Sequence, residues 1–148
     1  MDSCAFDPKY QPEDKSAEEI FYLFENSLEI SHSVQKEIDH PNTPDWVKRR
    51  ANRLAFTLPT DFTEDEKRTL CQIEITLAGQ GNIENIRQDA RHIFEAQKHG
   101  HYFVTTDKRI LERRDDLYAI CSCSLSVVKP SELWKLVEKY AERFPVTL

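Results

Sequence analysis

Apolar side chains recur every three or four residues along much of the chain, which is the spacing of one face of an α-helix. The first such stripe holds Ile20, Leu23 and Phe24, and it follows Ser16 and Glu19, which have the spacing of a capping box. The pattern predicts helices at about residues 16–28, 33–38, 43–55, 63–79, 83–99, 110–113 and from 130 onward.

Three other segments are typical of β-strands. Residues 101–106 are rich in β-branched and aromatic side chains, residues 125–128 form a short apolar run, and residues 29–31 are short and extended. Helical segments separate these stretches, which favours a parallel sheet covered by layers of helices. We therefore predict one α/β domain over residues 1–148, with a mostly helical lobe at about residues 40–82.

Composition is that of an ordinary soluble protein, with 39% hydrophobic and 31% charged residues. No apolar run reaches the roughly 20 residues that span a bilayer, and no signal peptide is visible, so we expect a cytoplasmic protein without membrane contact. The cysteines are Cys4, Cys71, Cys121 and Cys123. They are interpreted as reduced thiols, and the spacing of Cys121 and Cys123 argues against a shared zinc ion. The net charge of −6 argues against broad nucleic-acid binding but is compatible with an acidic metal site.

Four acidic residues occupy positions where the chain is predicted to change direction or to enter a helix: Asp2, Glu37, Asp89 and Asp107. Ligands of parallel α/β sheets bind beyond the carboxyl ends of strands, and Asp107 would occupy such an end. Each acid also has a structural interpretation. Asp107 would serve as a helix N-cap, and Asp89, at the edge of an apolar helix face, would reach water, an arginine or an amide. Their spacing alone does not show that the four converge.

Residues 88–107 resemble the C-terminal half of PIN-domain nucleases, in which an Asp-Ala pair opens a helical stretch and a strand ends in Thr-x-Asp. Here these motifs are Asp89-Ala90 and Thr105-Thr106-Asp107. Residues 125–133 resemble the family's last strand and the start of its closing helix. Asp2-Ser3 and residues 33–38 resemble its first and second acidic motifs. The resemblance covers most of the chain except about residues 40–80.

The resemblance implies a three-layer α/β/α fold with a central, mainly parallel sheet, and a metal-dependent endoribonuclease. The acidic residues of the family correspond here to Asp2, Glu37, Asp89 and Asp107. The resemblance implies that these four are catalytic and bind Mg²⁺ or Mn²⁺, and that Ser3 and Thr105 are supporting hydroxyls. Lys108, Arg109 and Arg113 adjoin this set and are predicted to bind RNA phosphates. A second basic run, residues 48–53, is interpreted mainly as a solvated helix face. Family members act as toxins of toxin–antitoxin pairs or in RNA processing, which implies an antitoxin or a homodimer as further partners.

The acidic set leads to an electrostatic expectation. Clustered carboxylates repel one another and raise their pKa values, so a divalent cation should stabilise the fold, and Asp107→Asn should leave the metal-free protein as stable as before. A metal there would activate water for in-line attack and leave a 5′-phosphate and a 3′-hydroxyl. In the family a strand precedes the first acidic residue, whereas only Met1 precedes Asp2 here. The alternative is therefore an inactive PIN-like domain that binds a protein or RNA.

Overall fold

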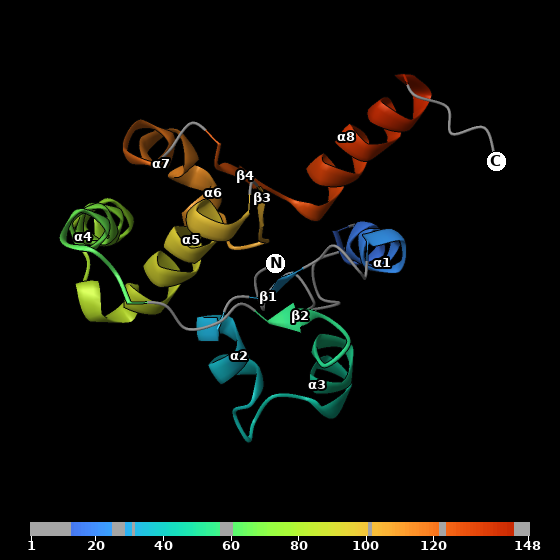
Figure 1. Ribbon diagram of the computed structural model, residues 1–148, viewed down its shortest axis with the longest axis horizontal. Coiled ribbons are helices and arrows are strands. Elements are labelled where there is room, and N and C mark those ends of the chain that lie inside the picture. Colours follow the sequence, from blue (N-terminus) through green and yellow to red (C-terminus); the bar gives the residue numbers. More distant parts are fainter. Residues whose placement is uncertain are drawn as a thin grey trace.

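The structure is a computed structural model that describes residues 13–24, 29–30, 32–56, 61–100, 102–121 and 124–143 (Figure 1). The helices are α1 (Glu13–Phe24), α2 (His32–Ile38), α3 (Asp45–Ala51), α4 (Glu64–Ala78), α5 (Arg87–His99), α6 (Lys108–Glu112), α7 (Arg114–Ile120) and α8 (Pro130–Arg143), with a 3₁₀-helix η2 (Ile83–Asn85). The strands are β1 (Glu29–Ile30), β2 (Ala55–Phe56), β3 (Tyr102–Val104) and β4 (Ser126–Val128).

The described strands form two parallel pairs, β1 with β2 and β3 with β4. Two helices connect the strands of each pair: α2 and α3 lie between β1 and β2, and α6 and α7 lie between β3 and β4. Parallel strands need such a crossover, because a tight turn cannot join them. The predicted α/β organisation with parallel strands is therefore present. It takes the form of two two-stranded sheets within a mostly helical structure.

Backbone hydrogen bonds hold β3 and β4 beyond the assigned strand residues. The amide of Thr105 donates to the carbonyl of Val128 at 3.0 Å, which continues the ladder to the carboxyl end of β3. The hydroxyl of Tyr118, on α7, accepts from the amide of Val127 at 2.9 Å and donates to its carbonyl at 3.1 Å. Tyr118 thus satisfies two backbone groups that an edge strand would otherwise leave open. The loop that follows β3 therefore starts from a fixed position.

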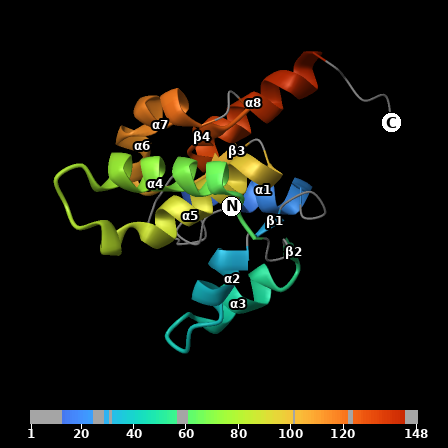
Figure 2. The same cartoon turned by 60° about the vertical axis from the view of Figure 1, so that its left-hand side comes forward.

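The larger hydrophobic core lies around α5. This helix packs against α4 and β3, and α4 in turn packs against α7 (Figure 2). The core is formed by Ile73, Ala90, Ile93, Phe94, Phe103, Ile110, Leu117, Cys121, Leu125 and Val127. At its margin, the ring of Phe62 meets Phe94 edge to face with centroids 4.9 Å apart. Burial of these side chains fixes the start of α5 and the end of β3 relative to each other.

A second hydrophobic cluster joins β1, α2 and α3, and consists of Ile30, Val34, Ile38, Ala51 and Leu54. Helix α2 also contacts α5, so the two clusters are linked through this pair of helices. Helices α1 and α8, far apart in the sequence, pack against each other at the opposite side from α4 (Figure 1). None of the helices in the described ranges has both the length and the apolar content of a bilayer-crossing segment.

Several predicted element boundaries are confirmed. Thr63 and Glu66 form the capping box at the start of α4, with both reciprocal hydrogen bonds present. Gly79, with φ of 54°, follows the last residue of this helix in a conformation that favours glycine. The strand after Gly100 and the closing helix from Pro130 also lie where the sequence placed them.

Other boundaries were predicted wrongly. The helix expected at residues 43–55 ends at Ala51, and after a turn at residues 52–54 the chain forms β2. Thr43 does not cap it, because its hydroxyl donates instead to the carbonyl of Glu37 at 2.9 Å. The helix expected from residue 83 is interrupted at Ile86, and α7 was not predicted.

The helical lobe expected at residues 40–82 is not one unit. Helix α3 packs against α2, whereas α4 packs against α5 and contributes Ile73 to the larger core. A surface lobe and a core helix have the same amphipathic pattern, so the sequence does not distinguish them.

Candidate functional site

Asp89 and Asp107 lie together although they are 18 positions apart in the sequence, and Arg109 joins their carboxylates. The Arg109 Nη2 atom lies 3.2 Å from Asp89 Oδ2 and 2.7 Å from Asp107 Oδ2. Both aspartate side chains are mostly buried, with exposed fractions of 24% and 21%, whereas Arg109 reaches the site from solvent at 63%. Two of the four predicted acids therefore meet at the carboxyl end of β3.

Local structure accounts for the position of each aspartate. Asp107 is the N-cap of α6, and its Oδ1 accepts from the amide of Arg109 at 2.8 Å, so its structural interpretation is confirmed. The Thr105 hydroxyl accepts from the amide of Asp107 at 3.1 Å and fixes the turn after β3. Asp89 lies in the first turn of α5, where the positive end of the helix dipole favours a carboxylate.

Arg109 corrects one expectation from the sequence. Its predicted role in binding RNA phosphates stays a prediction, and in the structure its guanidinium holds the two carboxylates together. It also supplies the counter-charge that the aspartate pair was thought to lack without a metal. Burial alone would raise the pKa of Asp107, but hydrogen bonds from the Arg109 side chain and backbone outweigh it, and this pKa lies below its ordinary value. The Arg109 guanidinium thus offsets the charge of Asp107 in the metal-free site.

The lowered pKa of Asp107 leads to a prediction of pH dependence. A carboxyl whose folded-state pKa is depressed adds stability above its unfolded pKa, and this stability is lost as the pH falls through the folded value. A double-mutant cycle with Asp107→Asn and Arg109→Met measures the coupling free energy between the two side chains. This coupling free energy should be constant from about pH 6 to 8 and should decline below about pH 4. Urea unfolding across this range measures it. Coupling that does not change on acidification would contradict the ion pair.

Glu37 lies on α2, near this region of the chain. It is half-buried in α2 and lines a hollow of about 520 Å³ together with Gln88, the residue before Asp89. Within the described ranges, no three His, Cys, Asp or Glu side chains are grouped so that they could hold one metal ion. Asp2 and Ser3 lie outside these ranges. The four-acid set therefore stays a prediction, and the observed part of it is the Asp89–Asp107 pair.

A buried carboxylate that sequence reasoning missed connects the two halves of the site region. Glu95, on α5, is 5% exposed, and its Oε2 accepts from the Ser33 hydroxyl at 2.7 Å and from the Ser33 amide at 3.4 Å. Its Oε1 accepts from Arg91 Nε at 2.9 Å. Ser33 lies in the first turn of α2, so Glu95 satisfies an amide at the start of that helix. Glu95 thereby fixes α2, which carries Glu37, against α5, which carries Asp89.

The remaining candidates have other surroundings. Lys108 is exposed, and Arg113 Nη1 lies 3.5 Å from Asp116 Oδ2, so the structure gives neither a place in the aspartate pair. His92, on α5, is 1% exposed. Cys121 packs into the larger core, and burial raises the pKa of its thiol to about 11. The prediction that Cys121 and Cys123 do not share a zinc ion stays a prediction, because Cys123 lies outside the described ranges.

Comparisons of the chain with protein-family models, with curated proteins and with solved structures find no match. The resemblance to PIN-domain nucleases therefore stays a prediction.

Proposed function

We propose that the chain is a PIN-like, metal-dependent endoribonuclease whose site is built on Asp89 and Asp107. The observation that carries this proposal is the convergence of these two carboxylates at the carboxyl end of β3. They are the acids in the most specific part of the resemblance, and they come from different elements. Carboxyl ends of parallel strands are where α/β folds bind ligands.

The finer fold proposal is a three-layer α/β/α domain with one central parallel sheet. Two features support it: both described strand pairs are parallel, and both are connected by helices.

The aspartate pair offers donors of the right chemistry for Mg²⁺ or Mn²⁺, since both ions prefer carboxylate oxygens. Asp89 and Asp107 would hold the cation in place of Arg109, with Glu37 and Asp2 completing the acidic set. Such a cation supplies positive charge to a phosphate and lowers the pKa of bound water. Arg109, on the exposed side of the pair, would then be released to pair with the negative charge of the substrate. The Thr105 hydroxyl would keep Asp107 in its turn throughout.

Metal-dependent cleavage of RNA by the purified chain tests the proposal. Single-stranded RNA should be cut in the presence of Mn²⁺ or Mg²⁺, cutting should stop when a chelator is added, and the products should carry 5′-phosphates. The end chemistry separates this activity from contaminating metal-independent ribonucleases, which leave 2′,3′-cyclic phosphates or 3′-phosphates. Absence of cleavage at millimolar Mn²⁺, or cleavage unchanged by the chelator, would contradict the proposal.

A second candidate is an inactive PIN-like domain that serves as a binding module. The Arg109 bridge favours it, because the guanidinium and the N-cap of α6 together give both aspartates a complete structural role. On this reading Asp107→Asn would slightly destabilise the protein, and Mn²⁺ would not change the melting temperature of either variant. The nuclease proposal instead requires that Mn²⁺ stabilise the native chain.

A further inference from the structure

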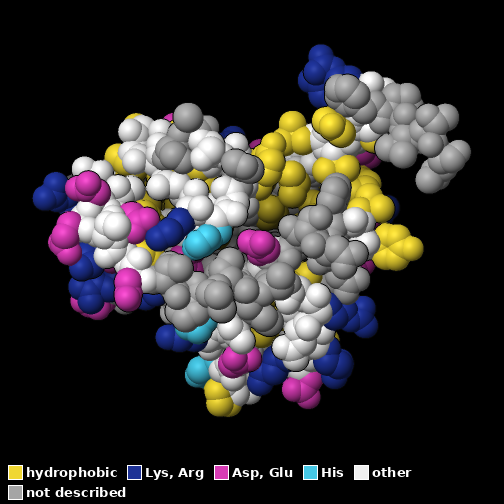
Figure 3. Space-filling view, in the orientation of Figure 1, with side chains coloured by type: hydrophobic (Ala, Val, Ile, Leu, Met, Phe, Trp, Pro, Cys, Tyr) yellow, Lys and Arg dark blue, Asp and Glu magenta, His cyan; other side chains and the backbone are white. Residues whose placement is uncertain are grey.

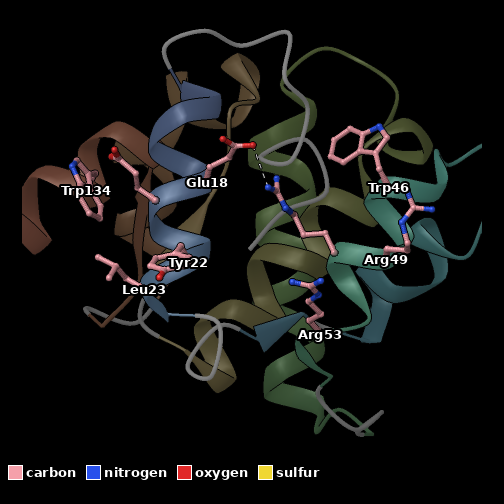
Figure 4. Close-up of a pocket in the computed structure, with 9 residues that line it drawn as sticks. Glu18, Tyr22, Leu23, Trp46, Arg49, Arg53 and Trp134 are labelled. Atoms are coloured by element: carbon pink, nitrogen blue, oxygen red, sulfur yellow. Dashed lines mark hydrogen bonds and ion pairs between the residues drawn. The ribbon is translucent and has the colours of Figure 1, made fainter.

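A wide groove lies across α1, away from the aspartate pair, and α3 and α8 form its sides. Its volume is about 820 Å³. Its lining residues are Glu18, Glu19, Tyr22, Leu23, Trp46, Arg49, Arg50, Arg53 and Trp134. Figure 4 shows Trp134 on one side of α1 and Trp46, Arg49 and Arg53 on the other. Helix α3 packs on α2, which packs on α5, so contiguous elements connect the groove to the aspartate pair.

Of the three aromatic residues in this groove, Tyr22 and Trp46 are exposed and Trp134 is partly buried. Tyr22 is 85% exposed and Trp46 37%, and Leu23 beside Tyr22 is 56% exposed. Figure 3 shows hydrophobic side chains gathered over α1 and α8, with lysine and arginine side chains over α3 below them. Large exposed apolar side chains that are rimmed by charge are typical of interaction sites.

The charge of the groove is opposite to that of the whole chain. Three arginines face two glutamates here, although the net charge of the protein is −6. One glutamate is already engaged, because Glu18 Oε1 lies 3.3 Å from Arg50 Nη2 and this ion pair links α1 to α3. The basic run at residues 48–53, interpreted from the sequence as a solvated helix face, therefore contributes three guanidiniums to one concave surface.

We propose that this groove binds single-stranded RNA, with Arg49 and Arg53 contacting phosphates and Trp46 and Trp134 stacking on bases. Positively charged grooves lined with aromatic side chains bind single strands because phosphates pair with the cations and every base offers a face for stacking. Guanidiniums suit this role, since they both pair with phosphate and stack on planar groups. The choice of RNA rests on the proposed nuclease function.

The experiment uses the fact that the chain has two tryptophans and that both line the groove. Oligouridine of roughly ten nucleotides, within the usual site size of such grooves, is titrated into the full chain with a chelator present, so that no cleavage occurs. Tryptophan fluorescence should be quenched in a saturable way. Arg49→Ala combined with Arg53→Ala should weaken binding at least about tenfold and make the slope of log K against log salt shallower by about 1.4. Lys48→Ala, on α3 beside Arg49 but outside the groove lining, should change the affinity less than about twofold.

The outcomes separate this proposal from the nuclease assignment. Quenching with the expected variant pattern supports the groove even if the chain cuts no RNA. Metal-dependent cleavage without quenching overturns the groove and leaves the nuclease standing. Equal weakening by Lys48→Ala overturns the groove as well, because it would indicate diffuse electrostatic attraction. Quenching by a polyglutamate peptide but not by oligouridine overturns it in favour of an acidic protein segment as the occupant.

Discussion

Asp89→Asn is expected to lower the rate of Mn²⁺-dependent RNA cleavage by at least about 100-fold, or roughly 2.7 kcal/mol of transition-state stabilisation. Asparagine keeps the size of the side chain but removes the negative charge that would offset the cation. Asp107→Asn should have an effect of the same size. Asparagine is as good an N-cap as aspartate, so α6 and the turn after β3 should remain intact in this variant. Single-turnover cleavage of a labelled RNA measures the loss.

Asp116→Asn is the matched control for these variants. Asp116 lies on α7, the helix that follows α6, and its carboxylate is exposed. It pairs with Arg113 and lies outside the aspartate pair. Its replacement should leave cleavage within about twofold of the native rate. If Asp89→Asn and Asp107→Asn cut RNA as fast as this control, the aspartate pair is structural and the nuclease site lies elsewhere or does not exist.

Glu95→Ala is expected to lower the free energy of unfolding by about 2–4 kcal/mol. The substitution removes a buried carboxylate that accepts three hydrogen bonds, and it leaves the buried Ser33 hydroxyl and amide without their acceptor. It also leaves a small cavity between α2 and α5. Most of the loss should come from the Ser33 side, because the Arg91 side chain is 43% exposed and its ion pair is screened by solvent. Urea unfolding followed by far-UV circular dichroism measures the change.

Two variants sharpen this prediction. Glu95→Gln keeps the volume and an acceptor for Ser33, so it should cost less than Glu95→Ala. Glu138→Ala, at an exposed position on α8, should stay within about 0.5 kcal/mol of the native chain. A loss for Glu95→Ala that is no larger than that of Glu138→Ala would mean that this carboxylate does not hold α2 against α5.

The fold was predictable where one face of an element is buried or a backbone signal is strong. Helix α8 has a continuous apolar stripe, and the capping box of Thr63 and Glu66 marks the start of α4. The two-residue strand β2 was missed because it is too short to show a period, and α7 because it follows α6 after a single residue. Helix α5 is buried on more than one side, by α4 and β3 and by α2. Its buried residues therefore include His92 and Glu95. A prediction that assumes one apolar face for this helix puts both residues on the surface.

The site was predictable only as far as the resemblance reached. The motif pattern paired Asp89 with Asp107, and the structure brings these two residues together. No pattern indicated that Arg109 would bridge them, because an arginine two residues after an N-cap looks like any other basic residue near a helix start. The Glu95–Ser33 contact joins residues 62 positions apart, and such a pairing depends on how the helices pack. The groove across α1 likewise combines three helices that are distant in sequence.

The central claim is that Asp89 and Asp107 form a metal site from which Arg109 is displaced. Calorimetric titration of the metal-free chain with Mn²⁺ tests this claim most directly. The native chain should bind Mn²⁺ at a single site, and Asp107→Asn should abolish this binding. Arg109→Met should bind Mn²⁺ more tightly than the native chain, because the competing guanidinium is gone. Two results would contradict the account: none of the three chains binds millimolar Mn²⁺, or all three bind it equally. The three chains are the native protein, Asp107→Asn and Arg109→Met.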